Sequence, residues 1–272
     1  VQNISEDTDF YLSGYYTKDG VVKAFVRRIQ LSLGQTGGLV NSGKFVSFDE
    51  MSYVNKIMVS GNYLLAAGYK NNSNTTTSGK IARATINGVD LIGIKYYENT
   101  LDSKYNSLVI ANDENVAKVI AVGNSAVENQ NGAVGGYITT CNIETFGEEN
   151  SCTSENPYFY LTYNMATVKQ TYFNDIVSRE NGFLIVGRSN VDRVRGQNDS
   201  YNTTNTENVF FVSLNNNLGI IDVQIKDNNS NDNLEAIRKI DDTKFMAVGK
   251  KANTGYYATI ELNENGSMSI VE

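Results

Sequence analysis

Two carboxylates are the residues of this chain whose type and placement could support catalysis. Asp175 and Glu235 are expected near the entry of neighbouring strands, and glycoside hydrolysis uses such a pair on either side of the scissile bond. The chain contains no His, which excludes Ser-His-Asp triads, Cys-His pairs and imidazole-based zinc or iron sites. It also contains no Trp, the usual ring that stacks on a sugar, although Tyr could stack instead. A hydrolase is therefore an alternative reading, and a non-catalytic role is preferred.

A series of polar residues occupies comparable places before apolar runs. Alignment of these runs brings together Gln2, Asn55, Asn106, Asn174 and Glu235. One interpretation is a ring of side chains that binds a ligand, an ion or ordered water. The other is that Asn hydrogen-bonds to neighbouring backbone where repeated units converge, and this second interpretation is favoured.

An arginine-rich loop is a further candidate binding region. Arg188, Arg193 and Arg195 lie within eight residues of each other and could bind an acidic sugar or a carboxylate of a partner. The alternative is a solvated loop whose arginines are balanced by nearby acidic residues. Loops on a rigid scaffold commonly carry binding sites. The candidate loops are Lys70–Gly79, Asn124–Gly132 and Arg188–Glu207.

Neither a metal site nor a cofactor site is predicted. The stretch Asp227–Asp232 is rich in oxygen ligands, but Asp232 replaces the glycine of a calcium loop and Arg238 replaces its final glutamate. Calcium is thus only a weaker alternative. Cys141 and Cys152 are close enough in sequence for a disulfide in an exported protein, whereas in the cytosol they would be two free thiols. The disulfide is the favoured reading.

The elements that must position these residues are repeated units. A short apolar run ending in glycine recurs at intervals of 54 to 64 residues, and each unit contains four candidate strands. Those of the fifth unit are Glu235–Ile240, Phe245–Gly249, Tyr256–Leu262 and Met268–Val271. The last strand of the second unit is expected at Asp90–Tyr97, and the first and last strands of the third unit at Ser107–Ala111 and Phe159–Met165. The repeated glycines are Gly14, Gly68, Gly123, Gly187 and Gly249.

These units predict an all-β protein: a five-bladed β-propeller of four-stranded antiparallel blades. A two-sheet sandwich is the less favoured alternative, because it would leave sheet edges open. The whole chain, 1–272, is expected to form one domain. The approximate blades are 1–50, 51–103, 104–170, 171–232 and 233–272.

The fourth unit carries a family resemblance. Its turn Glu180-Asn181-Gly182, its run Phe183–Gly187 and its segment Asn208–Asn215 resemble the exported β-propeller repeats of bacterial surface and secreted proteins. The fifth unit is similar through Lys244–Gly249 and Tyr256–Asn263. The resemblance implies export and a role in binding a ligand or partner, and it implies no catalytic residues.

Charge and hydropathy limit the possible partners. A net charge of −7 and a pI near 4.8 argue against nucleic acid. No apolar run is long enough to span a membrane, and the first residue, Val1, fits an exported chain trimmed of its signal segment. We therefore expect an extracellular or cell-surface monomer that binds or adheres to a carbohydrate or protein. The alternatives are a glycoside hydrolase and a structural surface domain.

Overall fold

The chain forms β-structure throughout the part that the structure, a computed structural model, describes. That part comprises residues 8–31, 45–73, 75–87, 90–113, 116–127, 132–155, 170–191, 203–226 and 230–271. It contains strands and no helix, so the predicted all-β class is confirmed. Within these residues there is accordingly no helix that could span a membrane.

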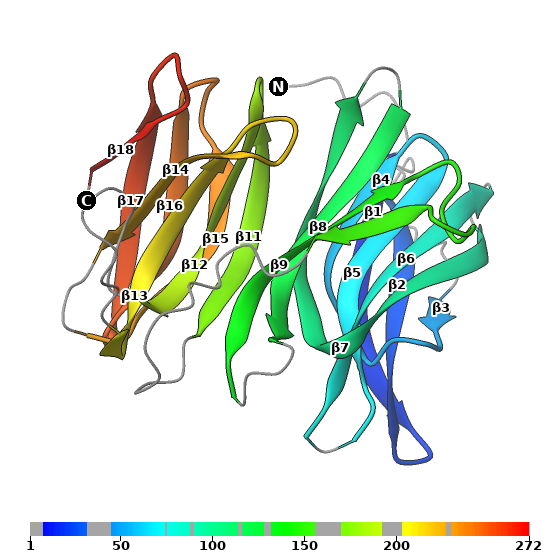
Figure 1. Ribbon diagram of the computed structural model, residues 1–272. Helices are drawn as coiled ribbons and strands as arrows, with labels where there is room; N and C mark the ends of the chain where they lie inside the picture. Colours follow the sequence, from blue (N-terminus) through cyan, green and yellow to red (C-terminus); the bar gives the residue numbers. More distant parts are fainter. Residues whose placement is uncertain are drawn as a thin grey trace.

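The strands form one three-stranded, one seven-stranded and two four-stranded antiparallel sheets (Figure 1). The seven-stranded sheet is divided here along β7 (Asp90–Asp113), where the pairing changes from β6 to β8, and the five resulting parts are called sheets I to V in chain order. Sheet I contains β1 (Thr8–Lys18), β2 (Val21–Leu31) and β3 (Phe45–Phe48). Sheet II contains β4 (Tyr53–Ser60), β5 (Tyr63–Asn71), β6 (Thr77–Asn87) and the first half of β7 (Asp90–Asp113). Sheet III contains the second half of β7, β8 (Val116–Ala126), β9 (Val134–Asn142) and β10 (Cys152–Glu155).

The two C-terminal sheets have four strands each, joined in sequence order. Sheet IV contains β11 (Thr171–Arg179), β12 (Gly182–Val191), β13 (Thr203–Leu214) and β14 (Ile220–Lys226). Sheet V contains β15 (Asp232–Lys239), β16 (Lys244–Lys251), β17 (Thr254–Leu262) and β18 (Met268–Val271). The strands of the fifth unit are thus close to the predicted ones.

Sheets II and III share one long strand. The sequence predicted separate strands at Asp90–Tyr97 and Ser107–Ala111, but β7 is continuous over 24 residues. Its first half pairs with β6 and its second half with β8. No proline interrupts the stretch, and β7 remains one strand where its pairing passes from β6 to β8, with a register irregularity between Glu98 and Asp102.

The last strand of sheet III also differs from the prediction. A strand was expected at Phe159–Met165, which lies outside the described residues. In the structure β10 pairs with β9, and Cys152 lies opposite Cys141 in the register. These two cysteines form a disulfide, so the predicted link is confirmed and it joins two adjacent strands.

A bulge in the neighbouring strand explains the repeated glycine. The first strands of sheets II to V carry register shifts whose extra residues are Asn55, Asn106, Asn174 and Glu235. A Cβ atom on the paired glycine would lie 1.9 to 2.0 Å from a backbone oxygen of that strand, where no side chain fits. The contacts are Gly68 with Tyr53 O, Gly123 with Lys104 O, Gly187 with Tyr172 O and Gly249 with Asn233 O.

The sheets pack face to face by one rule. On β12, the side chains two and four residues before the glycine, Ile185 and Phe183, pack toward sheet III. The side chains one and three residues before it, Val186 and Leu184, pack toward sheet V. The same alternation separates the cores between sheets I and II and between sheets II and III.

Contacts join the sheets in series. They run from sheet I to II, II to III, III to IV and IV to V. Within the described residues, no strand of sheet I contacts a strand of sheet V to a comparable extent. Figure 1 shows the blue strands of sheet I and the red strands of sheet V on opposite sides of the molecule.

Candidate functional site

The predicted amide series lies at the bulges and links neighbouring sheets. Asn55 Nδ2 donates to the backbone oxygen of Tyr105 at 2.7 Å. Asn106 Nδ2 donates to Phe173 O at 2.8 Å, and Asn174 Nδ2 donates to Leu234 O at 2.7 Å. Each acceptor immediately precedes the bulge residue of the next sheet. These amides therefore hydrogen-bond to backbone between sheets, as in the structural interpretation, and ligand binding by the series remains a prediction.

The two ends of the series differ from its middle. Glu235 occupies the bulge of sheet V. An ionised carboxylate is only an acceptor, so it cannot donate to a backbone oxygen as the Asn amides do. Its side chain is 56% exposed and lies 4.0 Å from Lys250 Nζ. Gln2 lies outside the described residues. The amide links consequently join sheets II to V, and the described links end at Glu235.

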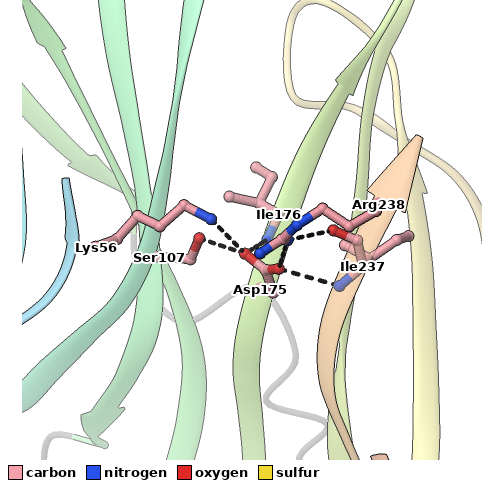
Figure 2. Close-up of polar contacts among 6 residues, drawn as sticks. All are labelled: Lys56, Ser107, Asp175, Ile176, Ile237 and Arg238. Carbon is pink, nitrogen blue, oxygen red and sulfur yellow. Dashed lines mark hydrogen bonds and ion pairs between the residues drawn. The ribbon is translucent and has the colours of Figure 1, made fainter. Parts of the chain in front are cut away.

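Asp175 is a buried acceptor that takes hydrogen bonds from sheets III, IV and V and pairs with an ammonium group of sheet II (Figure 2). Ser107 Oγ and the backbone N–H of Ile176 donate to its Oδ1. The Ile237 N–H and an Arg238 guanidinium N–H donate to its Oδ2 at 3.0 and 2.7 Å. Lys56 Nζ lies 3.6 Å from Oδ1. The carboxylate is thus surrounded by donors of the protein itself.

This environment bears on the predicted carboxylate pair. Asp175 is 4% exposed and both of its oxygens accept hydrogen bonds, whereas Glu235 is largely exposed. A general acid or nucleophile must reach the scissile bond, whereas both oxygens of Asp175 are engaged by the protein itself, and catalysis by this pair remains a prediction. The contacts of Asp175 are those of a residue that holds strands together.

The arginine loop is described only at its two ends. The Arg188 guanidinium lies 4.3 Å from the centre of the Tyr172 ring and bonds to Glu207 Oε2 at 2.7 Å. Arg193 and Arg195 lie outside the described residues. The described arginine is therefore neutralised by an acidic residue from the far end of its own loop.

The candidate calcium loop is also described in part. Residues 227–229 lie outside the described residues, and Asp232 is buried, accepting hydrogen bonds from the Ser230 hydroxyl and the Ala252 backbone N–H. The part of the chain that the structure describes has no group of three acidic or cysteine side chains arranged for a metal. Whether the loop binds calcium remains a prediction.

A pocket between sheets I and II, next to the loop that follows β5, has the size of a small-ligand site. It has a volume of about 590 Å³, within the range typical of ligand sites. Its walls come from the turn between β1 and β2, the start of β4, the end of β5, the loop 71–77 and Lys104 of β7. This loop belongs to Lys70–Gly79, one of the three loops singled out in the sequence. We call the cavity the tyrosine pocket.

Two stacked aromatic rings form one wall of the tyrosine pocket. The ring centres of Tyr53 and Tyr69 are 5.0 Å apart with 27° between the planes, and both residues are half-buried. The ring of Tyr15, which is largely exposed, has its centre 4.9 Å from that of Tyr53. Lys104 Nζ lies 4.7 Å from the centre of the Tyr69 ring, within cation–π distance. Burial, with a smaller effect of Tyr53, raises the pKa of Tyr69, so its hydroxyl stays neutral.

The polar loop opposite these rings is internally ordered. The Ser73 hydroxyl accepts the backbone N–H groups of Thr75 and Thr76. At the end of the loop, Thr77 donates its hydroxyl and backbone N–H to Asp102 Oδ1, at 3.0 and 2.8 Å. The described residues of this loop therefore present hydroxyl and amide groups beside the rings.

Sequence reasoning missed the tyrosines because Tyr is common in this chain and was interpreted as a strand former. A positional signal was nevertheless present. Tyr53 precedes the bulge Asn55 by two residues, Tyr69 follows the repeated Gly68, and the two tyrosines pair across β4 and β5. The equivalent pair in sheet IV is Tyr172 with Arg188.

Comparison of the chain with protein-family models and with curated proteins found no match.

Proposed function

We propose that this protein is an exported, non-catalytic binding module of the propeller type that holds a carbohydrate in the tyrosine pocket. The observation that carries the proposal is the Tyr53–Tyr69 stack with Lys104 against it, set in a cavity of ligand size. The alternative functions, a glycoside hydrolase and a structural surface domain, are tested by the same experiment below.

The propeller arrangement is supported by the side chains around Asp175. Lys56, Ser107 and Asp175 each follow the bulge residue of their own sheet and so occupy equivalent positions. All three meet at one carboxylate. Equivalent residues of consecutive sheets come together when their first strands converge on a common axis, as the inner strands of propeller blades do. We therefore propose that sheets I to V are five blades whose ring is open between sheets I and V, since the described strands of these two sheets make no extensive contact.

The chemistry of the pocket favours a sugar over other small molecules. Tyrosine rings offer flat apolar surfaces with a polar edge, which suits the face of a pyranose ring and its hydroxyls. The Asn, Ser and Thr side chains of the loop 71–77 add donors and acceptors of the kind a polyol needs. Lys104 would favour a sugar that carries a carboxylate, since an ammonium group attracts an anion in a partly desolvated site.

Export is supported by the disulfide between Cys141 and Cys152. Such bonds persist in oxidising compartments and are rare in the cytosol. An extracellular or surface location would also bring the pocket into contact with glycans, although a protein ligand remains the other class that the sequence leaves open.

The test is a glycan array probed with the purified chain, followed by calorimetric titration of the best ligand and a hydrolysis assay. Tyr69→Ala should weaken binding about 10-fold or more, because loss of one central aromatic contact commonly costs over 1 kcal/mol. The matched control is Tyr172→Ala, which removes the equivalent tyrosine of sheet IV and should leave the affinity unchanged. Lys104→Met should weaken binding of acidic sugars and leave neutral sugars unaffected.

Three outcomes separate the functions. Specific retention without turnover, reduced by Tyr69→Ala alone, supports the proposal. Turnover that is abolished by Glu235→Gln would instead identify a hydrolase. If neither binding nor turnover is detected, the function is that of a structural surface domain.

A further inference from the structure

The two ends of the sheet series leave apolar faces uncovered. In sheets II to IV, the side chains one and three residues before the repeated glycine are buried against the next sheet, as Ile120 and Val122 are in sheet III. The equivalent residues of sheet V, Met246 and Val248, are 41% and 42% exposed. Tyr257, which pairs with Val248 across β16 and β17, is also exposed. We call this surface the forward face of sheet V.

The opposite end shows the complementary pattern. Side chains two and four residues before the glycine are buried against the preceding sheet in sheets II to V, as Phe245 and Ala247 are. Their equivalents in sheet I, Phe10 and Leu12, are 48% and 52% exposed. We call this surface the rear face of sheet I.

An aromatic cluster continues the rear face across sheet I. Phe25 pairs with Gly14 and lies on the same side of the sheet as Leu12. Its ring stacks on Phe45 at 4.8 Å, and Tyr16 meets Phe45 edge-on at 5.1 Å. Exposed Phe45 and Phe10 make this an extended apolar patch, which on a soluble protein marks an interaction surface.

The structure indicates what covers these faces. Each of the four internal interfaces is built from a forward face packed on a rear face, so a forward face is shaped for a rear face. Sheets I and V lie on opposite sides of the molecule (Figure 1), and no extensive contact joins their described strands. The chain therefore carries both halves of a fifth such interface, unjoined.

We propose that two copies of this chain associate head to tail, with the forward face of sheet V of one copy packed on the rear face of sheet I of the other. The proposal departs from the monomer expected from the sequence. Such a contact joins different surfaces, so it either closes into a ring or continues into longer assemblies. The proposal stands independently of the tyrosine pocket.

The first test is the mass of the full chain in solution, measured by sedimentation velocity from 1 to 100 µM, a range chosen to bracket micromolar association. The wild type should shift to dimers or larger species as the concentration rises. Val248→Glu, on the forward face, and Leu12→Glu, on the rear face, should each raise the dissociation constant about 30-fold, as expected for central interface residues. Val59→Glu is the control, because Val59 is exposed but belongs to neither of these two faces.

The decisive test is a mixture of the two variants. Each variant keeps one intact face, and the intact forward face of the Leu12→Glu chain fits the intact rear face of the Val248→Glu chain. A 1:1 mixture should therefore form a dimer that neither variant forms alone, and a chain carrying both substitutions should stay monomeric.

Three results would overturn the proposal. A wild type that stays monomeric throughout, with variants of unchanged melting temperature, would show that the faces remain uncovered. A wild type that stays monomeric, with a lower melting temperature in both variants than in the wild type, would show that the two faces cover each other within one chain. If the wild type forms dimers but the 1:1 mixture of the two variants does not, the contact joins two forward faces or two rear faces.

Discussion

Replacing Asp175 by Asn tests whether one buried carboxylate holds the first strands together. The substitution keeps the size of the side chain and replaces one acceptor oxygen by a donor NH2 group. If the remaining oxygen stays with Ile237 and Arg238, the new NH2 faces Ser107, whose hydroxyl can turn to accept it. The backbone N–H of Ile176 and the ammonium of Lys56 then lose their acceptor.

The size of the effect follows from these losses. A buried N–H left without a partner costs about 1 to 3 kcal/mol. The lost ion pair with Lys56 is longer, at 3.6 Å, and the cation is partly exposed, so it adds at most about 1 kcal/mol. The free energy of unfolding should therefore fall by about 1 to 4 kcal/mol, which lowers the melting temperature by about 2 to 16 °C for a chain of this size.

The assay is calorimetric or circular-dichroism melting beside urea unfolding. The control is Asp49→Asn, which removes an exposed carboxylate that pairs with Lys23 at 2.9 Å and should change stability by less than about 1 kcal/mol. Equal melting temperatures for Asp175→Asn and the wild type would refute the role of Asp175 as an organising acceptor. A hydrolase role would appear instead as lost turnover at unchanged stability.

Three further perturbations have defined outcomes. Gly187→Ala places a methyl group 1.9 Å from a backbone oxygen and should cost about 3 kcal/mol or more in urea unfolding, whereas Gly255→Ala meets nothing within 4 Å and should be neutral. Burial raises the pKa of Tyr96 to about 12, so between pH 10 and 12 the unfolded chain loses a proton that the folded chain keeps. Stability should therefore fall as pH rises through this window, and Tyr96→Phe should lessen the fall; an equal fall in both proteins would contradict this origin. Replacing both Cys141 and Cys152 by Ser should cost about 3 kcal/mol, and thiol labelling of the unfolded, unreduced wild type should find no free cysteine if the disulfide is formed.

The repeat was readable from the sequence because its signals are local. A run such as Phe183–Gly187 needs only alternation and strand propensity to be recognised, and the glycine marks its end. The disulfide was readable because Cys141 and Cys152 are close in sequence. The equivalent positions of Asn55, Asn106 and Asn174 also emerged from the alignment of these runs.

What these residues do was not readable, because their partners come from other sheets. The acceptors of the Asn side chains are backbone oxygens 50 to 67 residues away. The hydrogen-bond donors to Asp175 come from residues up to 68 positions distant, and its ion-pair partner Lys56 is farther still. The long strand β7 was missed because Asn99, Asp102 and Ser103, which are residue types common in turns, stand where the pairing partner changes.

By itself, then, the sequence determined the unit: the short strands, the turns between them, the glycine after each apolar run and the nearness of the two cysteines. The tertiary structure decided how the units meet. It showed the repeated glycine facing a bulge, Asp175 as a shared acceptor, the Tyr53–Tyr69 wall of a pocket and apolar faces left open at the two ends. The physical reason is that strand and turn preferences act between near neighbours, whereas bulge contacts, buried acceptors and face packing depend on which sheet lies alongside.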